Sequence, residues 1–195
     1  MSVTTKRGPG RPPDLEKRRD VLDATRSLLA DVGYSSLTID GVAQHAGTAR
    51  SYVYRVWESK MALVEEALFE PLEGLEVPDT GSTMDDLRQW VALHVAVMDR
   101  PAHVKGLPGL TIELMSDPDA YRATYRRYVK PTEDGFTVIL DRARTRGEGV
   151  GEVDGATVSR VMSGTAMQLA HVPGNDTDAI VDVVMATLVG GVVGI

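Results

Sequence analysis

Residues 38–57 read TIDGVAQHAGTARSYVYRVW and predict two short helices joined by a tight turn at Gly47. Apolar residues recur at three- and four-residue steps on both sides of this glycine, which is the spacing of a helix face. The first helix opens at Thr38 and the second around Thr48 or Ala49. Such a pair is typical of a helix-turn-helix, whose second helix enters the major groove of DNA.

The polar face of the second predicted helix supplies candidate DNA-reading residues. Arg50, Ser51, Tyr52 and Arg55 lie on it, and their side chains are able to meet base edges or phosphates. Short helix pairs are also common in α proteins. A helical hairpin in an ordinary α domain, with its arginines merely solvated, is therefore the alternative.

Helical periodicity continues outward from this stretch and predicts an all-α fold of about nine helices. A helix follows Pro12 and Pro13, with Asp14 at its N-cap and Gly33 at its end. A fourth helix starts near Met61. We expect a flexible basic arm at 1–13, the helix-turn-helix domain at 14–70, a connection punctuated by proline and glycine at 70–80, and a second helical domain at 82–195.

The second domain is predicted to hold helices at about 83–98, 101–115, 117–146, 156–171 and 177–193. Pro131 lies inside the third of them, so we expect a kink there. The last two are rich in valine and glycine, a composition that normally favours strands. Asp176, Asp178 and Asp182 give a helix-like acidic start, so we predict helices for both.

The net charge of -7 alone argues against a nucleic-acid partner, because phosphate binding needs a basic surface. The charge is divided unevenly along the chain. Residues 1–60 carry 10 Lys and Arg against 7 Asp and Glu, whereas residues 61–195 carry 11 against 21. Such an asymmetry indicates a nucleic-acid-binding end joined to an acidic body.

The composition excludes several other classes. The chain has no cysteine, which removes disulfides, thiolate metal sites and cysteine nucleophiles. Its basic, proline-containing start lacks the apolar stretch of a secretory signal, and the apolar run 183–195 is too short to span a bilayer. We therefore expect a soluble, cytoplasmic protein.

Several separated motifs within residues 14–70 resemble the DNA-binding domain of TetR-family transcriptional regulators. They read LADVGYSSLTIDGVA at 29–43, AG at 46–47 and VYRVWESKMAL at 53–63. The resemblance implies an all-α homodimer with an N-terminal helix-turn-helix and a C-terminal domain for ligand binding and dimerisation.

The resemblance also implies roles for individual residues. Thr38 would cap the first helix of the pair and approach a phosphate, while Tyr54 and Lys60 would touch the DNA backbone. Base reading would fall on Arg50, Ser51 and Tyr52. Where the family often has serine this chain has Ala49, so we expect Thr48 to substitute as cap. Trp57 is expected to pack between helices.

The N-terminal arm carries the second DNA signal. KRGPGRPP at residues 6–13 resembles the Arg-Gly-Arg-Pro core of an AT-hook with disturbed spacing. An extended arm could place Arg7 and Arg11 in a narrow A·T-rich minor groove. A disordered solubilising tail is the alternative.

The C-terminal half resembles, more loosely, a regulatory domain of the same family. The family pairs its final two helices with those of a second subunit, and a two-fold dimer requires a roughly palindromic operator. Candidate interface residues are Val158, Val161, Thr165, Leu169, Ile180, Val184 and Leu188, some of which must serve the subunit's own core. Candidate residues of an apolar effector pocket are Trp90, His94, Met98, Met115, Tyr121, Tyr125, Met162 and Met167.

The chain contains no sequence motif typical of an enzyme active site. Residues 147–151 fail the dinucleotide fingerprint in spacing, and no phosphate-binding lysine loop or serine elbow occurs. The four histidines include no pair at metal-ligand spacing, so no metal and no cofactor is predicted. The sequence predicts a DNA-binding regulator, a repressor released by a small apolar effector. An interaction module or an effector-independent regulator is the alternative.

Overall fold

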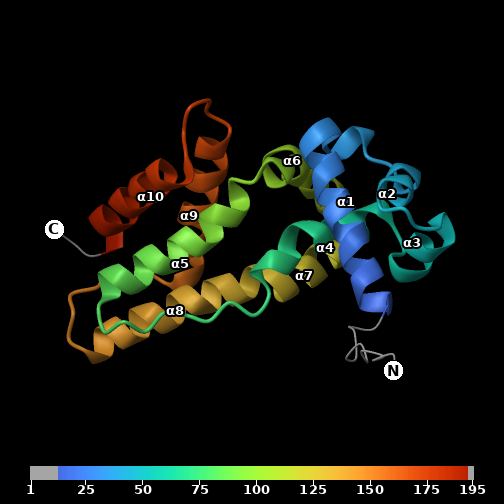
Figure 1. The fold of residues 1–195 in the computed structure, drawn as a ribbon. Helices are drawn as coiled ribbons and strands as arrows, with labels where there is room; N and C mark the ends of the chain where they lie inside the picture. The colour runs from blue at the N-terminus through green and yellow to red at the C-terminus, as the bar shows by residue number, and fades with distance from the viewer. Residues whose placement is uncertain (1–12, 193–195) are drawn as a thin grey trace, which may run out of the picture.

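The structure is a computed structural model that describes residues 13–192, with side chains at 15–189. These residues form helices and no strand, which confirms the predicted all-α class (Figure 1). The helices in chain order are α1 (Pro13–Ser36), α2 (Ile39–His45), α3 (Arg50–Val56), α4 (Lys60–Phe69), η1 (Glu70–Leu72), α5 (Thr83–Met98), α6 (Pro101–Met115), α7 (Pro118–Thr124), η2 (Tyr125–Val129), α8 (Lys130–Thr145), α9 (Gly155–Ala170) and α10 (Thr177–Val192).

The limits of α1 follow from proline and glycine chemistry. Proline suits the first helical position because its missing N–H has no partner there anyway, and α1 begins at Pro13. The expectation that Asp14 is the N-cap is therefore wrong, since Asp14 lies inside the first turn. Gly33 ends the regular helix as expected, because its φ of 71° leaves the helical region.

The first hydrophobic core joins α1–α4 to α6, although α6 follows the predicted inter-domain connection in sequence. Leu29, Val53 and Leu68 are fully buried in this core together with Leu110 of α6. Gly106 and Gly109 let α6 approach α1, because a side chain there would meet Leu29 or Tyr34. Tyr34 also donates a 2.5 Å hydrogen bond to Glu113 of α6.

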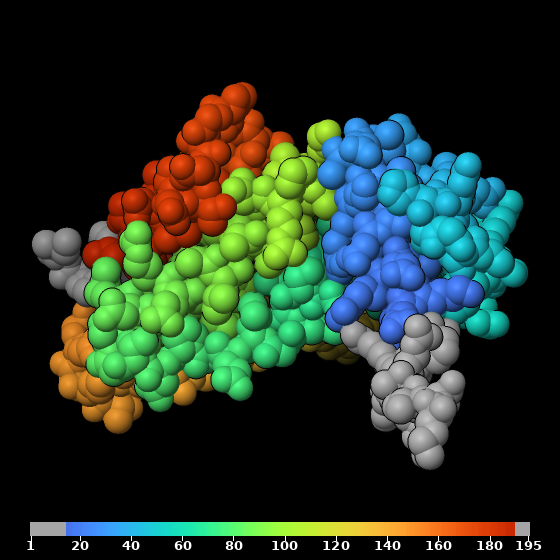
Figure 2. All heavy atoms as spheres, in the orientation of Figure 1, coloured from blue at the N-terminus to red at the C-terminus, as the bar shows by residue number. Residues whose placement is uncertain are grey.

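The second core is formed by α5, α8, α9 and α10. Its largest buried side chains include Phe136, Ile139, Met162 and Ile180. The two valine-rich helices are helical as predicted, and Asp154 caps α9 by accepting from the backbone N–H of Thr157 at 2.8 Å. In Figures 1 and 2 this core lies at the opposite end of the molecule from α2 and α3.

The connection at 73–82 has no regular structure. Side chains of α5 and α8 hold it in place by hydrogen bonds. Asp86, a fully buried side chain of α5, accepts hydrogen bonds from the backbone N–H and the hydroxyl of Thr80 at 2.7 and 2.8 Å. Arg142 donates to the carbonyl of Pro78 at 2.8 Å. These bonds satisfy backbone groups that a loop against a core would otherwise leave unpaired.

Pro131 produces a wide turn rather than a break. A proline removes the donor for the carbonyl four residues earlier. The residues before Pro131 form the π-helical segment η2, in which the N–H of Lys130 donates to the carbonyl of Tyr125. α7, η2 and α8 therefore follow each other without an intervening loop, as the single predicted helix requires.

Within residues 13–192, no helix combines the length and the apolar character that crossing a membrane requires.

We predict that Gly109→Ala destabilises the protein by about 1–3 kcal/mol, the usual cost of overpacking. The new Cβ would lie 2.6 Å from Cβ of Tyr34, so α1 and α6 must separate. Chemical denaturation measures the change in the free energy of unfolding. Gly149→Ala is the control, because no described atom beyond its chain neighbours lies within 4 Å of the added Cβ. Equal stability of the two variants would contradict the close packing of α1 on α6.

Candidate nucleic-acid interface

The helix-turn-helix has one side-chain cap, at the start of α2, and one glycine between its helices. The hydroxyl of Thr38 accepts from the backbone N–H of Gly41 at 3.1 Å and starts α2, as expected. Gly47 has φ 60° and turns the chain between the helices. Ala49 occupies the N-cap of α3 without a side-chain bond. The expectation that Thr48 substitutes is wrong, because its hydroxyl is buried without a hydrogen-bond partner among the described residues.

Four candidate residues of α3 are exposed and one is not. Arg50, Ser51, Tyr54 and Arg55 lie on the outer face. Tyr52 is only 6% exposed and belongs to the first core. The prediction that Tyr52 reads bases is therefore wrong: the turn of the helix places it beside Val53 on the inner face.

Arg50 is held by contacts on two sides. Its Nη1 donates to Oδ2 of Asp40 on α2 at 2.8 Å, and its Nη2 donates to the hydroxyl of Tyr54 at 3.3 Å. The guanidinium also lies over the Tyr54 ring, 5.1 Å from its centroid. Tyr54 and Asp40 both raise the pKa of Arg50. Sequence reasoning missed Asp40 as a site residue; its position in the first turn of α2 was the available signal.

Two further cations lie over the ring of Tyr52 on the inner side of α3. The Lys17 ammonium of α1 and the Arg55 guanidinium both lie over the ring of Tyr52, at 4.8 and 5.2 Å from its centroid. Cations are attracted to aromatic faces without losing their charge. Tyr52 thus makes a cation–π contact with each of two cations. Lys17 was also missed, because it lies far from the motif in sequence.

Lys60 stands at the start of α4, where Ser59 caps the helix by accepting from the backbone N–H of Ala62 at 3.1 Å. Its ammonium lies 4.1 Å from the centroid of the Tyr34 ring and donates to the Tyr34 carbonyl at 3.3 Å. An ammonium carries three donors. Lys60 therefore retains donors for a phosphate while it rests on Tyr34.

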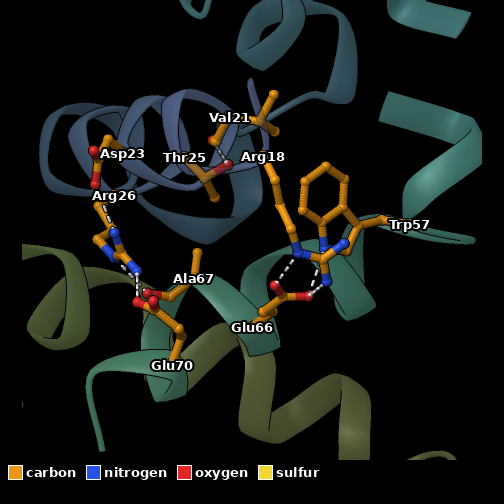
Figure 3. A network of polar contacts seen from close by, with 9 residues as sticks. All are labelled: Arg18, Val21, Asp23, Thr25, Arg26, Trp57, Glu66, Ala67 and Glu70. Atoms are coloured by element: carbon orange, nitrogen blue, oxygen red, sulfur yellow. Dashed lines mark hydrogen bonds and ion pairs between the residues drawn. The ribbon is translucent and has the colours of Figure 1, made fainter. Parts of the chain in front are cut away.

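A network of ion pairs fixes α1 against α4 and so orients the helix-turn-helix (Figure 3). Arg18 forms a two-pronged contact with Glu66, at 2.8 and 2.5 Å, and the Trp57 indole N–H donates to the same carboxylate at 2.9 Å. Arg26 donates to the carbonyl of Ala67 at 2.7 Å and pairs with Glu70. Trp57 is 3% exposed, so its expected packing role is confirmed.

The candidate effector residues divide into core and surface. Trp90, His94 and Met162 are buried. His94 donates from Nδ1 to the carbonyl of Trp90 at 2.7 Å and accepts from the hydroxyl of Thr132 at 3.1 Å. Burial lowers the pKa of His94, which matches a neutral ring with both nitrogens satisfied.

Three residues that we predicted to line the effector pocket are exposed on the surface instead. Met115, Tyr121 and Met167 are 71%, 49% and 41% exposed, so they do not line an interior pocket. Helix periodicity marks a stripe but does not say which neighbour covers it. Met98 and Tyr125 are partly buried, and the Tyr125 hydroxyl donates to the buried Glu133 at 2.5 Å.

An open groove of about 520 Å³ runs along the outer face of α5 instead. Leu75, Ala92, Leu93 and Ala96 line it, and Arg100 lies among its lining residues. None of the predicted effector residues lines this groove. Its signal in the sequence was the second apolar stripe of α5, opposite the stripe that contains Trp90.

The candidate dimer residues also divide. Val158, Ile180, Val184 and Leu188 are at most 2% exposed and lie in the protomer's own core. The prediction that these four residues form the dimer interface is therefore wrong, because a side chain that is already buried in its own protomer has no surface left for a partner. Leu169 packs partly against that core. Val161 is exposed and Thr165 is partly exposed on α9. Arg7 and Arg11 of the predicted arm lie outside the described residues.

Known proteins share both the sequence pattern and the fold. An HTH-type transcriptional regulator of Mycobacterium tuberculosis is 30% identical over 133 residues, which are 68% of this chain and 65% of that protein. The alignment therefore spans slightly less than two thirds of the relative's length. The regulator AqdR of Rhodococcus erythropolis is 27% identical over 156 residues, 80% of this chain and 72% of AqdR.

Solved structures give the same fold. The TetR family transcription regulator SCO0332 matches with a TM-score of 0.63 at 28% identity, over 90% of this chain and 98% of that one. The regulator FadR of Bacillus subtilis, solved with stearoyl-CoA, matches with a TM-score of 0.70 at 16% identity, over 89% and 98%.

Two family models cover most of the chain. The model of the bacterial regulatory proteins of the tetR family matches residues 21–67, and the model of the tetracyclin repressor-like C-terminal domain matches residues 77–188. Both describe transcriptional regulators and not enzymes. The chain belongs to the TetR family of helix-turn-helix transcriptional regulators.

Proposed function

We propose that this regulator is a cytoplasmic homodimeric repressor that binds a palindromic operator and is released by a small apolar effector. The observation that carries the proposal is the outer face of α3, where Arg50, Ser51, Tyr54 and Arg55 are exposed together at one end of the molecule. Arginine, serine and tyrosine side chains are the types that meet base edges and phosphates.

We assign the roles by the position of each residue on α3 and on the helices around it. Arg50 and Ser51, at the start of α3, read base edges in the major groove. Thr38, Tyr54 and Lys60 contact phosphates, helped by the positive ends of α2 and α4. Arg55 and Lys17 add attraction that depends on salt rather than on sequence.

The dimer forms through the outer faces of α9 and α10. Val161, Val183 and Thr165 leave surface there. Apart from the chain neighbours and the backbone of α9 itself, no atom of the described residues lies within 4 Å of a Cβ built on Gly164, so a partner helix can approach closely. Two-fold symmetry then presents two copies of α3, ~34–36 Å apart for successive major grooves.

Release by an effector needs a contact that differs between two conformations. The contact of α6 with α1 supplies the connection, because the regulatory end cannot shift α6 without disturbing Tyr34. FadR of Bacillus subtilis was solved with stearoyl-CoA, which supports an apolar ligand class. An effector-independent regulator is the second candidate, favoured by the closed packing of Trp90, His94 and Met162.

The test of this function is selection of bound duplexes from a random DNA library by the purified full-length chain. We expect an inverted repeat whose half-sites lie about one helical turn apart. Recovery of unrelated sequences with no shared half-site would contradict sequence-specific binding.

We predict that Lys60→Gln weakens binding about equally for operator and random duplex and lowers the salt slope by about 1, because one phosphate contact is lost. Fluorescence anisotropy over a salt series measures both. Lys130→Gln, which removes the same charge from α8, is the control. A loss confined to the operator would instead indicate a base-reading role for Lys60.

We predict that Val161→Glu shifts the protein from dimer to monomer, because a carboxylate would be buried without a partner in the interface. Val138→Glu on α8 is the matched control, since both valines are 38% exposed. Analytical ultracentrifugation measures the dissociation. Monomer formation by both variants, or by neither, would argue against an α9–α10 interface.

A further inference from the structure

We propose that Asp40 is a specificity-determining residue, which positions the Arg50 fork for one guanine and lowers affinity for all other DNA. The inference rests on the proposed function and adds to it a residue outside the recognition helix. It assigns to a carboxylate on the DNA-binding face a part in choosing the sequence.

The geometry places Asp40 behind Arg50. Oδ2 of Asp40, in the first turn of α2, accepts from Nη1 of Arg50 at 2.8 Å across the turn between the helices. Nη2 of Arg50 donates to the Tyr54 hydroxyl at 3.3 Å, and the guanidinium lies over the Tyr54 ring. Contacts from α2 and from the next turn of α3 therefore hold the guanidinium.

Stability does not explain this ion pair. The side chains of Arg50 and Asp40 are 61% and 56% exposed, and exposed pairs contribute little to folding. Affinity does not explain it either, because a carboxylate facing phosphates is repelled by them. What the pair does change is the freedom of Arg50, whose long side chain would otherwise lose several rotatable bonds on binding.

A held arginine can still read a base. A guanidinium has five N–H groups, of which these contacts engage one on Nη1 and one on Nη2. Three N–H groups remain as donors for a base edge, and arginine bound to O6 and N7 of guanine is the commonest specific contact in the major groove. A guanidinium whose direction is already fixed loses less conformational entropy when it binds the correct base. The same contacts keep it from turning toward a phosphate.

Arg55 provides the contrast on the same helix. Its guanidinium lies over the ring of Tyr52, 5.2 Å from the ring centroid, and no carboxylate of the described residues forms an ion pair with it. Its charge is not offset and its direction is not fixed by a second helix. Arg55 therefore suits phosphates, whereas Arg50 suits a base.

The test uses the full-length protein and starts from selected operator DNA. Arg50→Ala identifies the base pair that Arg50 reads, as the position where selection no longer prefers guanine. Asp40→Asn and Asp40→Ala are then measured on the operator and on the same duplex with that base pair replaced. We expect discrimination at this position to fall about five- to tenfold, within the range of one bidentate base contact.

Two further readouts separate positioning from a general effect. Binding of both Asp40 variants to random duplex should become about two- to threefold tighter, with a steeper salt dependence, because a negative charge has left the interface. Asp40→Glu, which keeps the charge, should retain part of the preference. Glu58→Gln, which removes a carboxylate just before Ser59 without touching Arg50, should leave base preference unchanged.

The proposal is overturned if Arg50→Ala changes base preference while the Asp40 variants keep it, or if Arg50→Ala changes no base preference. It is also overturned if Glu58→Gln relaxes the same position as strongly as Asp40→Asn. If the wild-type protein selects no sequence at all, the proposed function itself fails. Thermal melting of each variant shows whether a loss of binding reflects unfolding.

Discussion

The close packing of α1 on α6 is the constraint on which the rest of the structure depends. Gly106 and Gly109 carry no side chains where Leu29 and Tyr34 press against α6. The end that carries the helix-turn-helix therefore shares a hydrophobic core with a helix of the regulatory half, rather than meeting it at a surface. Any displacement of α6 must either carry α1 with it or open that core, and opening a packed core is costly.

Aromatic rings organise the positive charge at the DNA-binding end. The ring of Tyr52 holds Lys17 and Arg55, and the ring of Tyr34 holds Lys60. Arg50 differs, because it lies over the ring of Tyr54 and is also paired with Asp40. A ring holds a cation near the surface and leaves its charge available, whereas a carboxylate neutralises it. This arrangement lets a chain with net charge -7 present a cationic face without a large excess of lysine and arginine.

The sequence was most informative where local chemistry decides the structure. Thr38, Gly33 and Gly47 each act through their own backbone or hydroxyl, and each acts at the predicted place. It was least informative where a neighbouring helix decides. In a seven-residue helix such as α3, periodicity alone cannot say whether Tyr52 faces inward. Likewise nothing local assigns α6 to the first core or exposes Met115, because both follow from which helices pack together.

The wide turn at η2 lets one long helix face two cores. Thr124, Tyr128 and Thr132 are all at most 8% exposed although they follow each other at steps of four, which in a regular helix of 3.6 residues per turn would spiral away from the core. A turn that closes over five residues takes up the excess and keeps this stripe straight. Tyr128 can then stack on Phe69 of α4, 5.0 Å between ring centroids, while Phe136 fills the second core. The missing N–H of a single proline thus aligns the inner faces of two halves of the molecule.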